Sequence, residues 1–234
     1  MAKIILSNAS VFGVNVFDHK LSNIFKPKKR IKILENINFQ AEDGDKIGFL
    51  GKNGSGKSSL LKAISGIYPL HKGTRIVDGK ITSMLEAGVG MPIHVPGKNT
   101  LKMSFVYNNA TLEYNKDLAK EIFHFAELTD YQDMLFMQYS SGMQARLCVS
   151  SALFRDGDII MLDELLATVD QDFIKKATKK IQEKWQNAKI GFYVSHHIEE
   201  IIKLCNKCFI LENGSIVDSG ETMNMIANYN KRIL

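Results

Sequence analysis

The sequence predicts an α/β fold with a mainly parallel, doubly wound sheet, and three observations lead to this prediction. Short apolar runs alternate along the chain with stretches of helical periodicity, which is typical of strand–helix–strand units. Two of the runs, 158–162 and 189–194, end in polar pairs, as buried strands do when they lead into loops at one edge of a sheet. A third run, 46–50, leads through a glycine-rich segment into a helix.

Each expected element rests on a local pattern. The expected strands, from short apolar or alternating runs, are 4–6, 31–34, 37–40, 46–50, 74–77, 81–85, 158–162 and 189–194. The expected helices, from apolar side chains recurring every three or four residues, are 58–67, several turns within 100–136, 141–154, 172–186 and a short one after 196.

The order of these elements predicts how the domain is organised. The first strands form an N-terminal antiparallel β element, and a turn at Asp78-Gly79 separates two later strands. An Asn213-Gly214 pair between two apolar runs predicts a late hairpin. A loop rich in Gly and Pro, 88–97, opens a helical region. We therefore expect one domain over 1–234, with a helical subdomain inserted at about 88–155.

Composition excludes several classes of protein. Hydrophobic residues make up 45% and charged residues 24% of the 234 residues, the balance of a globular rather than a disordered chain. No run approaches the ~18 consecutive apolar residues of a membrane-spanning helix, and the first residues lack the pattern of a signal peptide. Three cysteines do not form a disulfide framework and favour a reducing compartment. The net charge of +5 suits an anionic ligand or surface and does not require nucleic acid.

Two other features allow more than one interpretation. The basic run Lys26–Lys32 is either a solvated loop or hairpin edge, or a contact with anionic lipid headgroups or a partner. Cys205 and Cys208 have the spacing of zinc ligands, but a structural zinc site needs four ligands and no second pair is present. We therefore expect both cysteines to be structural.

The segment 51–58 carries the clearest chemical signal. It reads GKNGSGKS and matches G-x-x-x-x-G-K-[ST] at every fixed position, between a strand and a helix as the motif requires. Glycines allow backbone N–H groups to point at phosphate oxygens, and the following helix directs its positive end at the same charge. Lys57 would reach the β- and γ-phosphates, and the Ser58 hydroxyl would bind Mg²⁺. The candidate nucleotide-binding residues are Gly51, Asn53, Gly54, Ser55, Gly56, Lys57, Ser58 and Ser59.

A second signal is the pair of carboxylates that follows the apolar run 159–162. Asp163 and Glu164 would lie at the carboxyl edge of the sheet, where ligands bind in such folds. Asp163 would hold Mg²⁺ directly or through water, and Glu164 would orient or deprotonate the attacking water. Such a pair is weak evidence alone and strong evidence beside an upstream phosphate loop.

A third pattern is Tyr139–Arg146, which reads YSSGMQAR. Ser140 can cap a helix, and Ser-Ser-Gly offers N–H and hydroxyl donors at a positive helix end. Together with 51–58 and the Asp163-Glu164 pair, in this order, the run resembles the nucleotide-binding subunit of an ABC transporter. The family signature is usually L-S-G-G-Q; here Tyr139 stands for Leu, Ser141 for the first Gly and Met143 for Gln.

The resemblance implies a P-loop NTPase core of ABC type, ATP as the substrate, Mg²⁺ as the cofactor and a homodimer. Each ATP would lie between the phosphate loop of one copy and the signature of the other, whose residues are Ser140, Ser141, Gly142 and Met143. His196 resembles the switch histidine that contacts the γ-phosphate, which makes it a catalytic candidate beside Glu164. Asp170 matches the position of the D-loop, which couples the two sites of a dimer.

Two further family positions have substitutes here. Glu86 takes the place of the usual Gln as a ligand of magnesium and water, and a carboxylate can do that work with added negative charge. Phe12 and Phe17 are candidates for the aromatic side chain that stacks on adenine, and either could equally belong to the core.

The departures from the family pattern point to a subgroup. Ser-Ser-Gly-Met, Glu86 and the run LEAGVGM resemble ABC subunits that export capsule, O-antigen or teichoic-acid polysaccharides, and the short stretch after the late hairpin resembles the type without an added C-terminal domain. This implies a peripheral subunit on the cytoplasmic face of a bacterial inner membrane, without nucleic acid. A separate permease would dock on the helical region and the 88–97 loop.

Three other functions compete with this interpretation. An ABC ATPase for another substrate would carry the same motifs. A soluble ABC ATPase that acts on nucleic acid or ribosomes would have duplicated cassettes or a long coiled coil, which the sequence does not contain. An ordinary P-loop kinase would lack the 139–144 run.

Overall fold

The computed structural model describes residues 1–14, 30–83, 91–107, 114–162, 170–195 and 197–233. These residues divide into two compact units, one of 1–79 with 192–234 and one of 80–191. Within the described ranges, no helix is long and apolar enough to cross a membrane.

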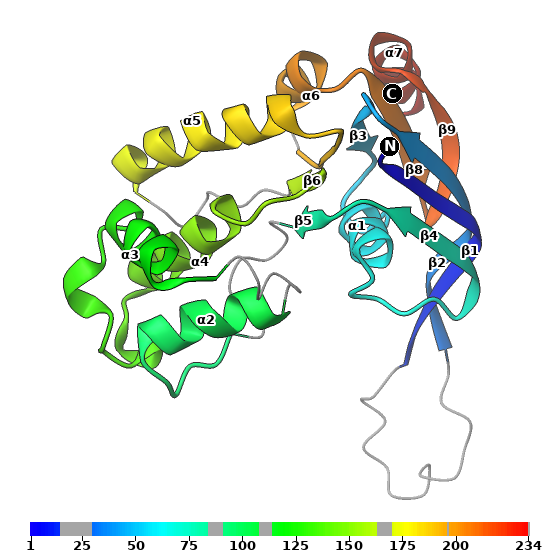
Figure 1. The fold of residues 1–234 in the computed structure, drawn as a ribbon. Coiled ribbons are helices and arrows are strands. Elements are labelled where there is room, and N and C mark those ends of the chain that lie inside the picture. The colour runs from blue at the N-terminus through cyan, green and yellow to red at the C-terminus, as the bar shows by residue number, and fades with distance from the viewer. Residues whose placement is uncertain (15–29, 84–90, 108–113, 163–169, 196, 234) are drawn as a thin grey trace, which may run out of the picture. The chain divides into compact units, whose positions relative to one another are not determined.

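The first unit contains a three-stranded antiparallel sheet. Strand β1 (Lys3–Val14) lies in the middle, with β2 (Arg30–Glu42) on one side and β4 (Lys72–Asp78) on the other (Figure 1). The two strands expected at 31–34 and 37–40 form the single strand β2. A bulge separates them, because Asn36 has a left-handed backbone (φ 49°) and its N–H bonds to Ser10 Oγ at 3.1 Å. The N-terminal antiparallel β element is thus confirmed.

The same unit holds a group of strands around an aromatic core. Strand β3 (Lys46–Leu50) pairs in parallel with β8 (Lys207–Glu212), which pairs antiparallel with β9 (Ser215–Glu221). Rings from four strands meet here: the Phe39–Phe209 centroids are 4.9 Å apart, and Phe49 and Phe192 stack at 6.0 Å. The strand that leads into the phosphate loop is therefore anchored by buried aromatic contacts.

Three helices of this unit pack on its strands or on one another. They are α1 (Lys57–Ser65), α6 (Ile198–Leu204) and α7 (Thr222–Ile233). The sequence analysis assigned no element to 222–233. The helix was missed because its buried apolar surface is small: Met225 and Ile226 are buried, while Met223 is 57% exposed. In Figure 1, α7 lies beside β8 and β9, and Asn228 Nδ2 donates to Asp218 of β9 at 3.2 Å.

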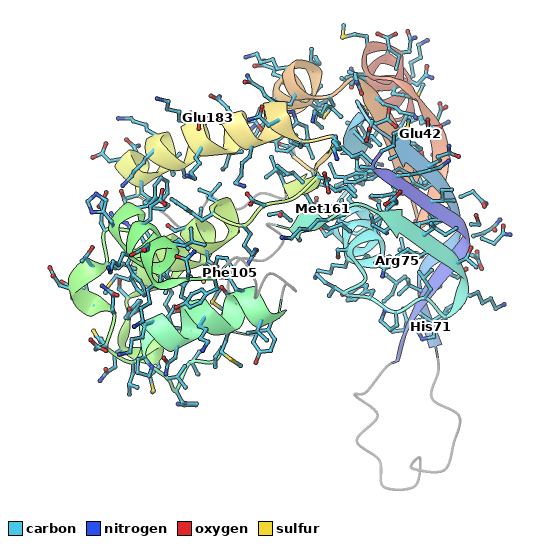
Figure 2. The ribbon with its side chains drawn as sticks, in the orientation of Figure 1. Glu42, His71, Arg75, Phe105, Met161 and Glu183 are labelled. Carbon is cyan, nitrogen blue, oxygen red and sulfur yellow. The ribbon has the colours of Figure 1, made fainter. Side chains whose placement is uncertain are left out.

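The second unit is mainly helical. Its strands β5 (Ile81–Ser83) and β6 (Ile159–Leu162) pair in parallel. Its helices are α2 (Gly97–Tyr107), α3 (Lys116–Phe125), α4 (Ser141–Leu153) and α5 (Gln171–Asn187), with short 3₁₀ turns η3 (Thr129–Tyr131) and η4 (Phe136–Gln138). Along the chain, the division between the two units falls within strand β7 (Ile190–Tyr193). Fully buried side chains, including Leu101, Phe105 (labelled in Figure 2) and Phe123, form the core of the helical region.

The strands on either side of Asp78-Gly79 do not pair with each other. Strand β4 joins the antiparallel sheet through β1, whereas β5 pairs with β6 in the other unit. The turn therefore passes the chain from one unit to the next. The described segments of 88–155 are mainly helical, as expected.

Candidate nucleotide-binding site

Residues 51–58 form a loop whose backbone is shaped by three glycines. Gly51, Gly54 and Gly56 have φ angles of 154°, 78° and 107°, and the last of these is the N-cap of α1. Such turns direct successive N–H groups inward and form an anion-binding concavity. No acidic residue occupies the first turn of α1, so its positive end is left for an anion. The predicted strand, loop and helix are present in the predicted order.

Lys57 lies inside this loop. Its side chain is buried (8% exposed), and its Nζ donates to the carbonyl oxygens of Gly51 at 2.7 Å and Lys52 at 3.1 Å. The ammonium is thus held against the loop backbone. Ser58, the next residue, is exposed in the first turn of α1, so its hydroxyl is an accessible oxygen ligand for a hard cation.

The late hairpin supports the loop from one side. Gly214 N–H donates to Ser55 O at 2.9 Å, and Gly214 O accepts from Glu35 N–H of β2 at 2.9 Å. A Cβ on Gly214 would lie 2.3 Å from Ile33 O, and its φ of 78° is strained for other residues. The hairpin predicted from Asn213-Gly214 is confirmed, and its glycine also links the phosphate loop to the antiparallel sheet.

Replacement of Gly214 by Ala is expected to destabilise the protein and weaken nucleotide binding together. Left-handed backbone costs a non-glycine residue about 1–2 kcal/mol, and the overlap with Ile33 O adds to this, so we expect the melting temperature to fall by about 4–8 °C. Calorimetric unfolding and ATP titration measure the two effects.

Gly44→Ala is the matched control for this prediction. Gly44 also has a positive φ (93°), but nothing lies within 4 Å of the Cβ that the substitution would add. The expected shift is therefore smaller, about 2–4 °C, with unchanged ATP affinity. Equal effects of the two substitutions would mean that the contact with Ile33 is unimportant.

The second unit presents the signature run at the start of α4. Ser140 is the N-cap, and its Oγ accepts from Met143 N–H at 3.2 Å, as the sequence predicted. Ser140 and Ser141 are exposed and Gly142 is half-exposed, whereas the Met143 side chain packs on the helical core. Where the family has a polar Gln, this chain thus has a residue directed toward its own core.

Tyr139, which replaces the family's Leu, is buried, and its hydroxyl group has a hydrogen-bond partner. Its hydroxyl donates to Tyr131 O at 2.7 Å, and its ring lies 5.4 Å from that of Phe136. Burial, and secondarily the nearby Asp133 carboxylate, raises the pKa of Tyr139 to about 12, so the phenol remains a donor at neutral pH. Gly97 makes room for it, since a Cβ there would lie 2.0 Å from the hydroxyl oxygen. The substitution is explained by this local fit.

Asp170 is the N-cap of α5 in the same unit. Its side chain accepts from Phe173 N–H at 3.1 Å and from the guanidinium of Arg146. The Phe173 N–H and then Arg146 hold the pKa of this carboxyl below its usual range. A direct side-chain contact therefore joins Asp170 to Arg146 of the signature helix. The sequence analysis did not predict this contact.

Several predicted site residues lie outside the described ranges. Asp163 and Glu164 directly follow β6, whose four residues are all buried; His196, Glu86 and Phe17 also fall outside, as does the basic run up to residue 29. Ser195 and His197, the neighbours of His196, are described. Ser195 Oγ donates to Glu200 at 2.9 Å and accepts from His197 N–H at 3.0 Å, and Tyr193 Oη donates to Glu200 at 2.5 Å.

Phe12 is described and lies in β1. It is half-buried, and its ring packs edge-on against His71 at 5.6 Å between centroids, with Phe12 N–H donating to His71 Nδ1 at 3.2 Å.

Cys205 and Cys208 are both buried free thiols, and burial is the main cause that raises the pKa of each. Within the described ranges, no group of three or more His, Cys, Asp or Glu side chains could hold a metal ion.

A cavity of about 370 Å³ beside the phosphate loop was not predicted. It is lined by residues 52–55, by the end of β8 and by Tyr229 and Arg232 of α7. Arg232 Nη1 bonds to Glu212 at 3.2 Å, so α7 contacts the same hairpin that supports the loop. No local pattern in the sequence indicates this contact, since 20 residues separate the two side chains.

Comparison with known proteins agrees with this geometry. The model of the ABC transporter family matches residues 34–167. The chain is 35% identical over 197 residues to the O-antigen export system ATP-binding protein RfbE of Yersinia enterocolitica. The alignment covers 84% of this chain and 81% of the Yersinia protein. It is 28% identical over 216 residues to the teichoic acids export ATP-binding protein TagH of Listeria innocua. That alignment covers 91% of this chain but only 64% of the Listeria protein.

The fold also matches a solved structure. A dimeric ATP-binding cassette in a post-hydrolysis state, bound to ADP and phosphate, superposes with a TM-score of 0.69. The match covers 94% of this chain and 98% of that one, at 18% identity. At that identity the likeness establishes the fold.

Proposed function

Because the chain belongs to the ABC transporter family, we propose that it is the subunit that binds and hydrolyses ATP to drive polysaccharide export through a separate permease. The observation that carries the proposal is the phosphate loop 51–58, formed by glycines, the start of α1 and the buried Lys57. The names of the relatives, which refer to O-antigen and teichoic-acid export, support the substrate class.

The residues of this chain would act on ATP in distinct ways. Backbone N–H groups of 53–58 would bind the phosphates, with Lys57 neutralising their charge. Glu164 would accept a proton from the attacking water, and His196 would contact the γ-phosphate. Ser58, Asp163 and Glu86 would hold Mg²⁺, which would supply charge neutralisation at the phosphates. The exposed Ser58 hydroxyl fits this use.

Dimerisation would complete each site. Ser140, Ser141 and Gly142 are accessible at the start of α4 and offer hydroxyl and N–H donors to the ATP of a second copy. Met143 would contribute least, because Ser140 already engages its N–H and its side chain packs on the core. Bound ATP would favour the closed dimer through contacts that the open state lacks.

The permease would cover an apolar part of the second unit. Ile93 and Met137 are 46% and 51% exposed, and their backbones are joined by a 2.9 Å hydrogen bond. Val106 and Tyr107, at the end of α2, are 40% and 59% exposed. Adjacent exposed apolar side chains, such as those of Ile93 and Met137, are typical of interaction sites. A subunit docked there would lie on the cytoplasmic face of the bacterial inner membrane.

Surface polysaccharide tests the proposal directly. Deletion of the gene from its source bacterium is expected to remove one long-chain polysaccharide from the cell surface, with polymer retained inside the cell. The intact gene restores surface polymer, whereas the Glu164→Gln variant does not. Gel analysis of surface and intracellular polysaccharide measures both pools.

Two outcomes would contradict the proposal. Normal surface polysaccharide together with the loss of another transported compound would assign the chain to a different ABC transporter. Restoration of export by the Glu164→Gln variant would separate export from ATP hydrolysis and remove the motor function.

A further inference from the structure

Three charged side chains from separate segments meet near the start of α4. Arg146 of α4 donates through Nε and Nη2 to Asp170 Oδ2, at 2.9 and 2.6 Å, and through Nη1 to Glu127 Oε2 at 2.6 Å. The guanidinium also lies 5.5 Å from the ring centroid of Phe173 in α5. One side chain thus links the signature helix to the segment that follows α3 and to the start of α5.

The two ends of this link are both close to proposed contacts with a second copy. Arg146 is six residues after the N-cap Ser140, about 9 Å along the helix axis. Asp170 uses Oδ1 to cap α5 and Oδ2 to bind Arg146, so the guanidinium joins the second turn of α4 to the N-cap of α5. A large movement of the signature helix relative to the start of α5 would therefore disrupt these bonds.

The geometry favours a positioning role over a contribution to folding. The Arg146 side chain is 23% exposed, and those of Asp170 and Glu127 are 46% and 55% exposed. Ion pairs between groups this accessible contribute little to folding stability. A planar guanidinium that donates two N–H groups to one oxygen and a third to another carboxylate does, however, fix the relative orientation of its partners.

We propose that Arg146 is a positioning residue that locks the signature tip, 140–142, to Asp170, so that both meet the partner protomer in register. The inference rests on the proposed function, in which that tip contacts the nucleotide of the second copy. Glu127 holds the guanidinium from the opposite side; it has a left-handed backbone (φ 60°), and Lys176 Nζ also lies 3.7 Å from its carboxylate.

Substitution of Arg146 is expected to lower turnover without changing ATP affinity. Misplacement of groups around a reacting centre by about 1 Å can cost a hundredfold, so we expect kcat of Arg146→Met to fall on the order of tenfold or more. Monomer affinity for ATP and the melting temperature stay near those of the unmodified protein. Lys176→Met is the matched control, because it removes the other cation near Glu127 and leaves Asp170 untouched.

A mixing experiment separates this role from a general loss of structure. An Arg146→Met chain keeps its phosphate loop, and a Lys57→Ala chain keeps Arg146. A hybrid dimer of the two therefore has one site with an intact loop and an intact signature tip. We expect the ATPase activity of the mixture to exceed that of either variant alone. Absence of recovery would mean that Arg146 acts within its own chain and would overturn the inference.

Two more variants test the pairing itself. Asp170→Asn retains a helix-capping side chain but loses the charge that Arg146 binds. If the two side chains act as a pair, the ATP turnover of the double variant with Arg146→Met should be no lower than that of the more impaired single variant. Additive losses would show that the two side chains act separately. If unmodified protein forms no ATP-dependent dimer, the proposed function fails; if it does and Arg146→Met is fully active, only this inference fails.

Discussion

Replacement of Glu164 by Gln is expected to lower ATP turnover by about a hundredfold or more while ATP binding persists. Glu164 follows β6, a fully buried strand, and is the carboxylate that would take a proton from the attacking water. An amide of the same shape cannot accept that proton. Phosphate release measures turnover, and titration calorimetry measures binding. With hydrolysis blocked, the ATP-bound dimer should persist and be visible by light scattering.

Glu183→Gln is the control for this substitution. Glu183 is another carboxylate of the same length, on α5, and has no proposed catalytic role (Figure 2). We expect its turnover to match that of the unmodified chain. Near-normal turnover in Glu164→Gln would assign the proton acceptor to another residue and leave Glu164 without its catalytic role.

Replacement of Lys57 by Ala is expected to weaken ATP binding. The ammonium is buried in the loop, held by Gly51 O and Lys52 O, where a triphosphate would place its charge. Loss of a buried charge opposite another charge costs at least about 2 kcal/mol, which corresponds to roughly a 30-fold loss of affinity. Calorimetric titration with a non-hydrolysable ATP analogue measures this effect without turnover.

The neighbouring Lys52 provides the comparison. It lies in the same loop but is exposed, so its charge is screened by water. Lys52→Ala is expected to change ATP affinity far less than Lys57→Ala does. Unchanged affinity in Lys57→Ala, with a folded protein, would contradict the binding mode proposed for the phosphate loop.

Features set by neighbours in the chain could be predicted from the sequence. The strand 46–50 is observed as Lys46–Leu50, and the helix expected at 58–67 is observed as Lys57–Ser65. The Ser140 cap and the Asn213-Gly214 hairpin are likewise confirmed. In each case an apolar run, a glycine or a capping hydroxyl within a few residues determines the backbone.

Features that depend on distant segments could not be predicted. The Arg146–Asp170 and Arg146–Glu127 contacts join residues 24 and 19 positions apart. The periodicity of apolar residues within a single element does not predict such contacts. The same holds for Gly214, whose hydrogen bond to Ser55 crosses most of the chain. Strands β4 and β5 are neighbours in sequence but pair with β1 and β6, because each satisfies its backbone groups in a different sheet.

Two copies of the chain would enclose ATP between the phosphate loop of one and the signature tip of the other. A crystal structure of the Glu164→Gln variant with Mg²⁺ and ATP tests this arrangement. We expect N–H groups of 53–58 to surround the phosphates of each ATP, and Ser140–Gly142 of the second copy to contact its γ-phosphate. A complex in which 140–142 faces solvent, with ATP bound by a single chain, would rule out this arrangement.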